Sequence, residues 1–337
     1  MIFTISKDVF EDNSDSNIRE LYKIWLQVDE RHRMYIYDEI ESLLNCEWFK
    51  SLPKPFQDEI KEHIAWSGLN PPPTSLLKIS NESSGNFSTM EAYEILSTPL
   101  TLILENAEND AYFIRALLNN FKKKGKKIEQ HLNNGWLKFG MGAGSTIPNL
   151  IRSEKRRFDE NKDSFPKNSH SYLRYFALID SDKLHPDQPL KDEKQNLVQF
   201  LEENEIPFHI LAKREMENYL PDAVFEEISH NEDYIRCYLS LSDVQKDFFD
   251  IGSGFPNKRF EQLLPEIKDL YGGISATSKD IFRNRELEIK DKNGKKLSVK
   301  TELPKLFLSQ NVTQEGLQNR AGSDELQKIL DKISELL

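Results

Sequence analysis

Two aspartates one residue apart, Asp180 and Asp182, directly follow a short apolar run at residues 175–179. In an extended chain, side chains two positions apart project to the same side, so both carboxylates would face one point. Carboxylate oxygens are the ligands that hard divalent cations such as Mg²⁺ and Mn²⁺ prefer. The pair therefore predicts a metal site, although an aspartate that caps a helix beside a solvated neighbour gives the same pattern.

A third carboxylate, Glu105, ends another apolar run at residues 101–104. If this run is a strand next to the one that leads to Asp180, Glu105 would complete a cluster of oxygen ligands. A charged residue at a strand end is also common without any site. Asp110 follows five residues later and could either reach the metal or cap the helix expected after it.

The segment from Lys213 to Leu220 follows a further apolar run at residues 207–211 and carries both signs of charge. Glu215 and Glu217 are candidate oxygen ligands, and Lys213 could bring positive charge to the transition state. The same segment could instead be a surface turn that leads into a helix.

A glycine-rich turn at residues 140–145 invites comparison with nucleotide-binding loops. A phosphate-binding P-loop needs a Gly-Lys-Ser/Thr sequence, whereas this turn continues as Gly144-Ser145-Thr146, which excludes that motif. The turn could still offer backbone N–H groups to a phosphate, because glycine lets the main chain approach closely.

These candidates are spread over a regular alternation of strand and helix patterns. Helical stretches separate the four apolar runs, which is typical of parallel βαβ units. The sequence therefore predicts an α/β protein with a Rossmann-like parallel sheet, whose ligands gather at the carboxyl ends of the strands. The expected strands are 101–104, 136–139, 175–179 and 207–211, and the expected helices between them are 113–121, 147–158 and 191–204.

We expect three regions along the 337 residues: a mainly helical region at 1–95, the core at 96–222, and a mainly helical region at 223–337. Within the last region, apolar residues flank Asn293-Gly294, which predicts a β-hairpin near 287–299.

The charge is uneven: 45 basic against 56 acidic residues give a formal charge of −11, which argues against a protein that coats nucleic acid nonspecifically. Residues 1–95 carry 9 basic and 17 acidic residues, a net of −8. Residues 121–157 carry 10 basic and 2 acidic residues, a net of +8. This basic stretch is either a solvated helix face or a phosphate-binding surface. Its proposed nucleic-acid contacts are Lys122, Lys123, Lys124, Arg156 and Arg157.

Other classes of protein are disfavoured. Two cysteines cannot build a disulfide framework or a four-cysteine zinc site. No apolar run is long enough for a membrane span, and the first residues lack the pattern of a signal peptide, so we expect a cytoplasmic protein without a membrane partner.

Taken in order, these motifs resemble those of TOPRIM domains, over about residues 98–222. The last motif is similar to that of overcoming-lysogenization-defect (OLD) family nucleases and of stand-alone TOPRIM effectors in bacterial phage-defence systems. The motifs are Ile103-Leu104-Glu105, the glycine turn, Ala177-Leu178-Ile179-Asp180-Ser181-Asp182 and Arg214-Glu215-Met216-Glu217-Asn218-Tyr219-Leu220.

The resemblance implies a site for Mg²⁺ or Mn²⁺. It assigns Glu105, Asp180 and Asp182 to one metal, and Asp110 and Glu217 to a second, with Glu215 as the weaker candidate. Two positions depart from the family: Asn106 replaces the usual glycine, and Leu184 replaces the third aspartate of topoisomerases. The second departure favours the nuclease branch.

The resemblance also implies a divalent-metal-dependent endonuclease that acts as an antiviral defence effector. OLD nucleases carry an ATPase domain ahead of the TOPRIM domain, and residues 1–95 are too short for one, so a separate ATPase or sensor is the expected partner. The acidic residues 1–95 could be the element that docks this partner or an inhibitory element. The substrate could be DNA or RNA. The chain could also form a homo-oligomer.

Two other functions stay open. The chain could be a non-catalytic TOPRIM scaffold or binding subunit of a defence complex. It could also be another Asp-x-Asp enzyme, such as a sugar-nucleotide transferase, but that function leaves Glu105 and residues 213–220 unexplained.

Overall fold

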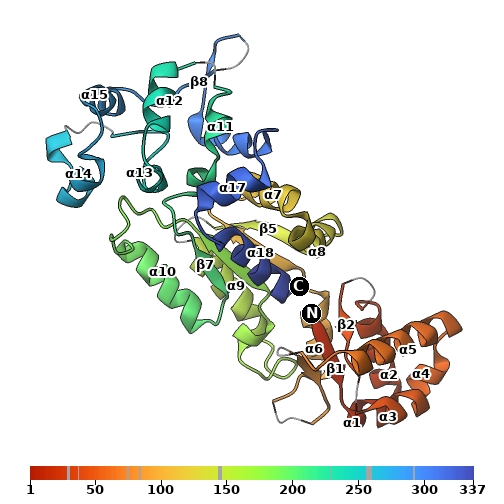
Figure 1. Cartoon of the computed structure of the whole chain (residues 1–337). Helices are drawn as coiled ribbons and strands as arrows, with labels where there is room; N and C mark the ends of the chain where they lie inside the picture. The colour runs from red at the N-terminus through yellow and green to blue at the C-terminus, as the bar shows by residue number, and fades with distance from the viewer. Residues whose placement is uncertain are drawn as a thin grey trace.

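The computed structural model describes residues 1–337 except 29–30, 37, 74–75, 83–84, 143–145, 229, 256–259 and 291–292. Figure 1 shows a red and orange region at one end, a central sheet, and a blue and cyan helical region at the other end. The two termini of the chain lie close together beside the central sheet (Figure 1).

The central sheet confirms the predicted parallel α/β core. Its four strands run parallel in the order β5-β4-β6-β7. Each lies within one or two residues of its expected position. The two central strands, β4 and β6, are apolar runs buried on both faces, as a parallel sheet favours, whereas β5 and β7 at the edges are only partly buried. The strands are β4 (Leu100–Leu104), β5 (Leu137–Met141), β6 (Tyr175–Ile179) and β7 (Phe208–Ile210).

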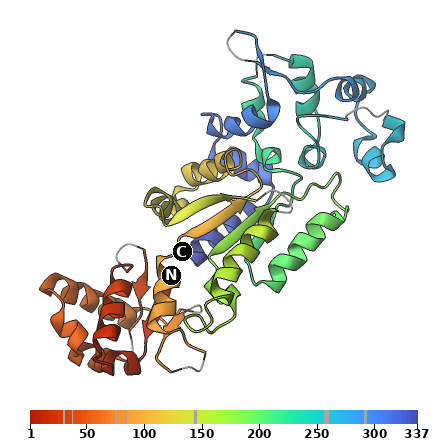
Figure 2. The same cartoon turned by 180° about the vertical axis from the view of Figure 1, so that it is seen from behind.

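Helices cover both faces of this sheet. Leu102, Leu104 and Leu178 belong to one core cluster, whereas Ile103 and Ile179 belong to another, as the two-residue period of a strand requires. Figure 1 shows α18 in front of the sheet, and Figure 2, from behind, shows the opposite layer in front. The first layer is α7 (Ala111–Asn120), α8 (Lys122–Asn133) and α18 (Glu325–Leu336), and the second is α9 (Thr146–Asp159) and α10 (Asp192–Glu203).

The N-terminal region has its own core and a small sheet that the sequence analysis did not predict. Its strands, two to four residues long, are too short for a periodic pattern to reveal them. They are β1 (Ile2–Ile5), β2 (Arg33–Met34) and β3 (Leu77–Ile79), parallel in the order β2-β1-β3. The helices are α1 (Lys7–Glu11), α2 (Asp15–Trp25), α3 (Ile40–Asn45), α4 (Glu47–Ser51), α5 (Lys54–Leu69) and α6 (Thr89–Ser97).

The C-terminal region is mainly helical, and its hairpin pairs β8 (Ile289–Lys290) with β9 (Lys296–Leu297). In the described residues, no helix has the length and apolar character needed to cross a membrane. The helices before α18 are α11 (Asp222–Phe225), α12 (Glu232–Leu239), α13 (Asp243–Asp247), α14 (Pro265–Tyr271), α15 (Ala276–Asn284), α16 (Val299–Glu302) and α17 (Gln314–Ala321). The short 3₁₀ helices of the chain are η1 (Ser169–Tyr172), η2 (Met216–Tyr219), η3 (Phe260–Gln262) and η4 (Pro304–Leu308).

Helix α18 is fastened to the core through Glu325 at its first turn. The Glu325 carboxylate accepts hydrogen bonds from the backbone N–H of Ala212 at 2.8 Å and from the Tyr219 hydroxyl, and it pairs with His209 at 2.8 Å. The helix is therefore part of the central layer structure although it lies more than 100 residues further along the chain.

Candidate functional site

The two acidic motifs lie at the carboxyl edge of the central sheet, on neighbouring strands. Ile103 of β4 pairs with Ala177 of β6, so Glu105 stands level with the end of β6, one residue before Asp180. Parallel neighbours thus bring the two carboxylates to the same edge, as the alternation of strands and helices predicts.

Asp180 is the innermost carboxylate of this edge. Its Oδ1 atom is buried and has no hydrogen-bond partner in the described part of the chain. Burial, and then the negative charges of Glu105, Glu217 and Asp110, raise the pKa of Asp180 well above its usual value. These four carboxylates therefore lie close enough for their charges to act on Asp180, whose Oδ1 atom lacks a donor among the described residues.

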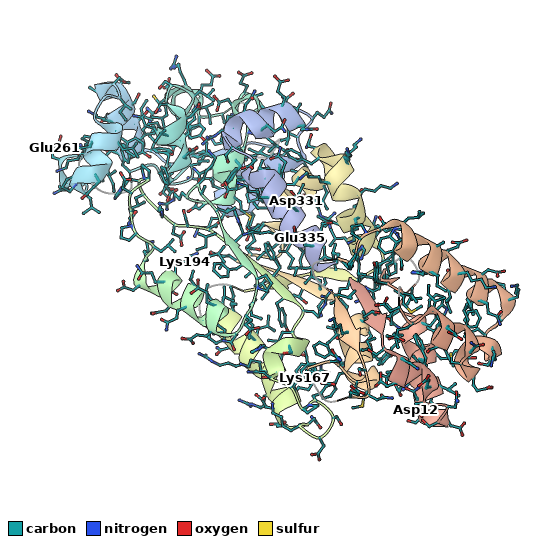
Figure 3. All side chains as sticks on the ribbon, turned by 60° about the horizontal axis from the view of Figure 1, so that its bottom comes forward. Asp12, Lys167, Lys194, Glu261, Asp331 and Glu335 are labelled. Atoms are coloured by element: carbon teal, nitrogen blue, oxygen red, sulfur yellow. The ribbon has the colours of Figure 1, made fainter. Side chains whose placement is uncertain are left out.

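Lys194, at the start of α10, joins two of the other carboxylates. Its ammonium group pairs with Glu105 and lies 3.1 Å from Oδ2 of Asp182. Glu105 and Asp182 are thus at most two hydrogen-bond lengths apart. Burial opposes the charged form of Lys194, but the charge of Glu105 and its hydrogen bond raise the pKa of Lys194 overall. Figure 3 labels Lys194, well separated from Lys167 and Asp12.

Asp182 reaches Lys194 from a turn and not from an extended strand. Its φ of 52° lies in the left-handed region, which aspartate tolerates better than most residues do. Its N–H donates to the carbonyl oxygen of Arg214 at 3.0 Å. The expectation that an extended chain aligns Asp180 with Asp182 is therefore wrong, and the turn brings the second carboxylate to the site.

Asp110 and Glu217 form the second part of the acidic group. Burial raises the pKa of Asp110 to about 6, and the negative charge of Glu105 contributes to this increase. Asp110 accepts a hydrogen bond from the N–H of Asn106 at 2.8 Å, so it closes the turn after β4 and makes no capping hydrogen bond to α7. Burial and the charges of Glu215 and Asp110 raise the pKa of Glu217 to about 8.

The motif that follows β7 is held against the Asp180 turn by main-chain contacts. The Ser181 hydroxyl donates to the carbonyl oxygen of Lys213 at 2.7 Å. Asn218, fully buried, accepts from the N–H of Glu215 at 3.0 Å and donates to the carbonyl oxygens of Lys246 and Phe249. This asparagine fixes the acidic motif to the 246–249 segment.

Lys213 does not point into the acidic group. Its ammonium is buried and pairs with Asp247, which also pairs with Arg320, and it lies over the ring of Tyr219. Burial and the charge of Arg320 lower the pKa of Lys213 to about 8. The cation that contacts the carboxylates is Lys194, which the sequence analysis did not single out.

Among the described residues, no three His, Cys, Asp or Glu side chains are already arranged to hold a metal ion. The donor set nevertheless fits a hard divalent cation, because the unsatisfied Asp180 oxygen is surrounded by carboxylates whose repulsion a cation would relieve. Binding requires Lys194 to release Glu105 and Asp182.

The glycine turn ends beside Glu105. The N–H of Gly142 donates to the carbonyl oxygen of Leu104 at 2.8 Å. A side chain at Gly142 would come within 2.5 Å of Ile103 and Ile147, so the close approach of β5 requires glycine there. Residues 143–145 lie outside the described residues, and the phosphate-binding role expected for the turn stays a prediction.

The basic residues lie away from the carboxylates. Lys122, Lys123 and Lys124 form the first turn of α8. Helix α7, which has 10 residues and is therefore about 15 Å long, separates them from the carboxyl edge of the sheet. Arg156 and Arg157 lie about 15 Å along α9 from its start at that edge. Two of these five residues are in ion pairs, Lys124 with Asp331 and Arg157 with Glu94 at 2.6 Å.

Replacing Lys194 with methionine should strengthen the binding of Mn²⁺. The substitution removes a positive charge beside two candidate ligands, and a unit charge at 4 Å is worth roughly 1–4 kcal/mol at effective dielectric constants of 80 to 20. We expect an affinity at least about tenfold higher by calorimetry. Lys191→Met, an exposed lysine just before the same helix, is the control. Equal affinities in both variants would contradict competition between Lys194 and the metal.

No protein-family model, no curated protein and no solved structure matches this chain. The chain is therefore described by its own fold and site: an α/β protein with a four-stranded parallel sheet and a group of partly buried carboxylates at the sheet's carboxyl edge.

Sequence reasoning missed three residues that complete the site: Lys194, Arg214 as a structural cation, and Asp250. The Arg214 guanidinium lies 3.1 Å from both Glu215 and Asp250. Nothing local distinguishes Lys194 from other lysines at the start of a helix.

Proposed function

We propose that this protein is a divalent-metal-dependent endonuclease with a TOPRIM core, and that it serves as an antiviral defence effector. The supporting observation is the convergence of Glu105, Asp110, Asp180 and Glu217 around a buried carboxylate oxygen without a partner. Hydrolysis of a phosphodiester needs a cation beside the phosphate to stabilise the negative charge that develops there, and this group of carboxylates is suited to bind a divalent cation.

In this proposal, Glu105, Asp180 and Asp182 hold one Mg²⁺ or Mn²⁺, and Asp110 and Glu217 hold a second. When bound, the metal supplies Lewis acidity and lowers the pKa of a water molecule. With a pKa of about 8, the Glu217 carboxyl is protonated at neutral pH and must lose its proton to act as a ligand. Lys194 takes the place of Lys213 as the cation nearest to the phosphate.

One observation favours the alternative of a non-catalytic scaffold. Lys194 already neutralises Glu105 and Asp182, as an internal cation would in a core that has no need of metal. A scaffold of this kind would bind no divalent cation at millimolar concentration, and replacing Lys194 would not change that.

The test is cleavage by the full chain. Single- and double-stranded DNA and RNA are incubated with Mn²⁺, with Mg²⁺ or with EDTA, alone and with a candidate ATPase or sensor protein, which remains the proposed partner. We expect metal-dependent products for at least one substrate. Absence of cleavage under all conditions, together with absence of metal binding, would refute the proposal.

The basic residues on α8 remain proposed contacts to the nucleic-acid backbone. At about 15 Å from the carboxylates, they would touch the substrate away from the cleaved bond. Reversing Lys122 and Lys123 to glutamate should reduce the slope of log affinity against log salt by about 0.7–0.9 for each lost phosphate contact. The rate at saturating substrate should stay unchanged. An unchanged slope would make these lysines a solvated helix face.

A further inference from the structure

A cavity of about 180 Å³ opens next to the carboxylate group, between the turn after β6, the 248–255 segment and α14. Most of its wall is apolar and aromatic. The side chains that matter here are Leu184, Arg214, Asp250, Phe255, Leu263 and Tyr271.

The aromatic part of the wall is held rigidly. The rings of Phe255 and Tyr271 pack edge to face with centroids 5.1 Å apart. Gly254 precedes Phe255 with a φ of 64°, and a side chain there would come within 2.5 Å of the carbonyl oxygen of Phe282. Only glycine lets this segment lie so close to α15, so the cavity wall is fixed by the fold.

Two polar side chains enter this apolar wall. Arg214 donates through Nη2 to Oδ2 of Asp250 at 3.1 Å and through Nε to Glu215 at 3.1 Å, while its Nη1 is buried without a partner in the described part of the chain. Oδ1 of Asp250 accepts the N–H of Ser253 at 2.7 Å. A carboxylate has about four acceptor sites, and the described residues supply donors to two of those of Asp250.

The same residues connect the cavity to the carboxylates. The carbonyl oxygen of Arg214 accepts from the N–H of Asp182, and the charge of Asp250 acts on both Glu215 and Glu217. If the phosphate of a nucleotide lies at the carboxylates, the nucleoside attached to that phosphate can therefore reach the cavity. At 180 Å³ the space is smaller than the roughly 300–1,000 Å³ of a site for a drug-sized ligand, and it suits a single flat ring system.

We propose that this cavity binds a guanine base of the nucleic-acid substrate, on the basis of the proposed nuclease function. Arginine donates to the O6 or N7 atoms of guanine, and aromatic walls stack on the flat base. Guanine alone among the common bases offers a carboxylate two adjacent N–H groups, at N1 and at the 2-amino group, next to an oxygen acceptor. Arg214 and Asp250 present the complementary donor and acceptors side by side.

The test measures the binding of nucleoside 5′-monophosphates to the full chain by calorimetry. We expect guanosine monophosphate to bind at least tenfold more tightly than the adenosine, cytidine and uridine monophosphates. Inosine monophosphate, which lacks the 2-amino group, should bind more weakly than guanosine monophosphate. Equal binding of all five, or no binding, would overturn the proposal.

Two variants test the location. Leu263→Trp fills the cavity and should abolish the preference, whereas Leu264→Trp, at the exposed neighbouring residue, should retain it. Asp250→Asn replaces acceptors by an amide donor and should shift the preference from guanosine to xanthosine monophosphate, whose 2-oxygen accepts. A merely structural Asp250 would weaken both nucleotides equally, which would overturn its assignment to the base.

The outcome separates this inference from the proposed function. Metal-dependent cleavage with no preference for guanine, unaffected by Leu263→Trp, would remove the base site and leave the nuclease. Guanine-specific binding that Leu263→Trp abolishes, in a chain that cleaves nothing, would retain the base site and remove the nuclease.

Discussion

Asp180→Asn should reduce the metal-dependent cleavage that we propose for this protein by about a thousandfold or more, while the protein remains folded. The amide keeps the shape of the side chain but replaces a negatively charged ligand at the centre of the group. A metal contributes several kcal/mol to catalysis of this kind, and each 1.36 kcal/mol corresponds to a factor of about ten in rate. The measurement is the single-turnover rate with saturating Mn²⁺.

The fold of this variant is checked by thermal melting without metal. Because desolvation and neighbouring negative charges disfavour the ionised form of Asp180, its neutral replacement should melt at the same or a higher temperature. Asp187→Asn, an exposed residue in the loop after the same strand, is the matched control and should keep full activity. Wild-type cleavage by Asp180→Asn would remove this residue from the mechanism.

Without divalent metal, the protein should lose stability as the pH rises from about 5 to about 8. Burial raises the pKa of Asp110 to about 6 and that of Glu217 to about 8, so the folded protein holds protons that the unfolded chain releases. An acid with a raised pKa in the folded state destabilises that state increasingly as the pH rises from the unfolded pKa to the folded one. The loss should reach a few kcal/mol, because a difference of one between the folded and unfolded pKa values corresponds to about 1.36 kcal/mol.

Mn²⁺ should reverse this loss, and most strongly near pH 8, because the carboxyls must be ionised to bind it. The measurement is the melting temperature from pH 5 to 8.5, with Mn²⁺ or with EDTA. Glu217→Gln removes the carboxyl whose pKa burial raises to about 8, and this variant should flatten the EDTA curve. A wild-type protein whose stability rises from pH 6 to 8 in EDTA would show that these carboxyls are not repelling one another.

The sequence analysis located the two central strands of the core because they are uninterrupted apolar runs, and Glu105, Asp180 and Asp182 because they follow those runs. It could not show the direction of long side chains. Lys213 and Lys194 are both plausible cations near a strand end, and only packing turns the first towards Asp247 and the second towards Glu105.

Other features depend on contacts between distant segments. The three short strands of the N-terminal sheet pair residues about 30 to 75 positions apart, and no local pattern records that. The cavity beside Arg214 is lined by α14 and the 248–255 segment, and no local pattern predicts that these two segments meet there. The charge of residues 121–157 was clear in the sequence, but the pairing of Lys124 with Asp331 was not.

The attachment of Glu325 to Tyr219 and Ala212 has a consequence for how the protein is made. The layer that covers one face of the central sheet includes α18 beside α7 and α8, so part of this face remains uncovered on a ribosome until residues up to Leu336 have emerged. Contacts over such a separation slow folding and place this step late. A chain that is still being synthesised would therefore hold its carboxylates on an unfinished core until α18 has packed against the sheet.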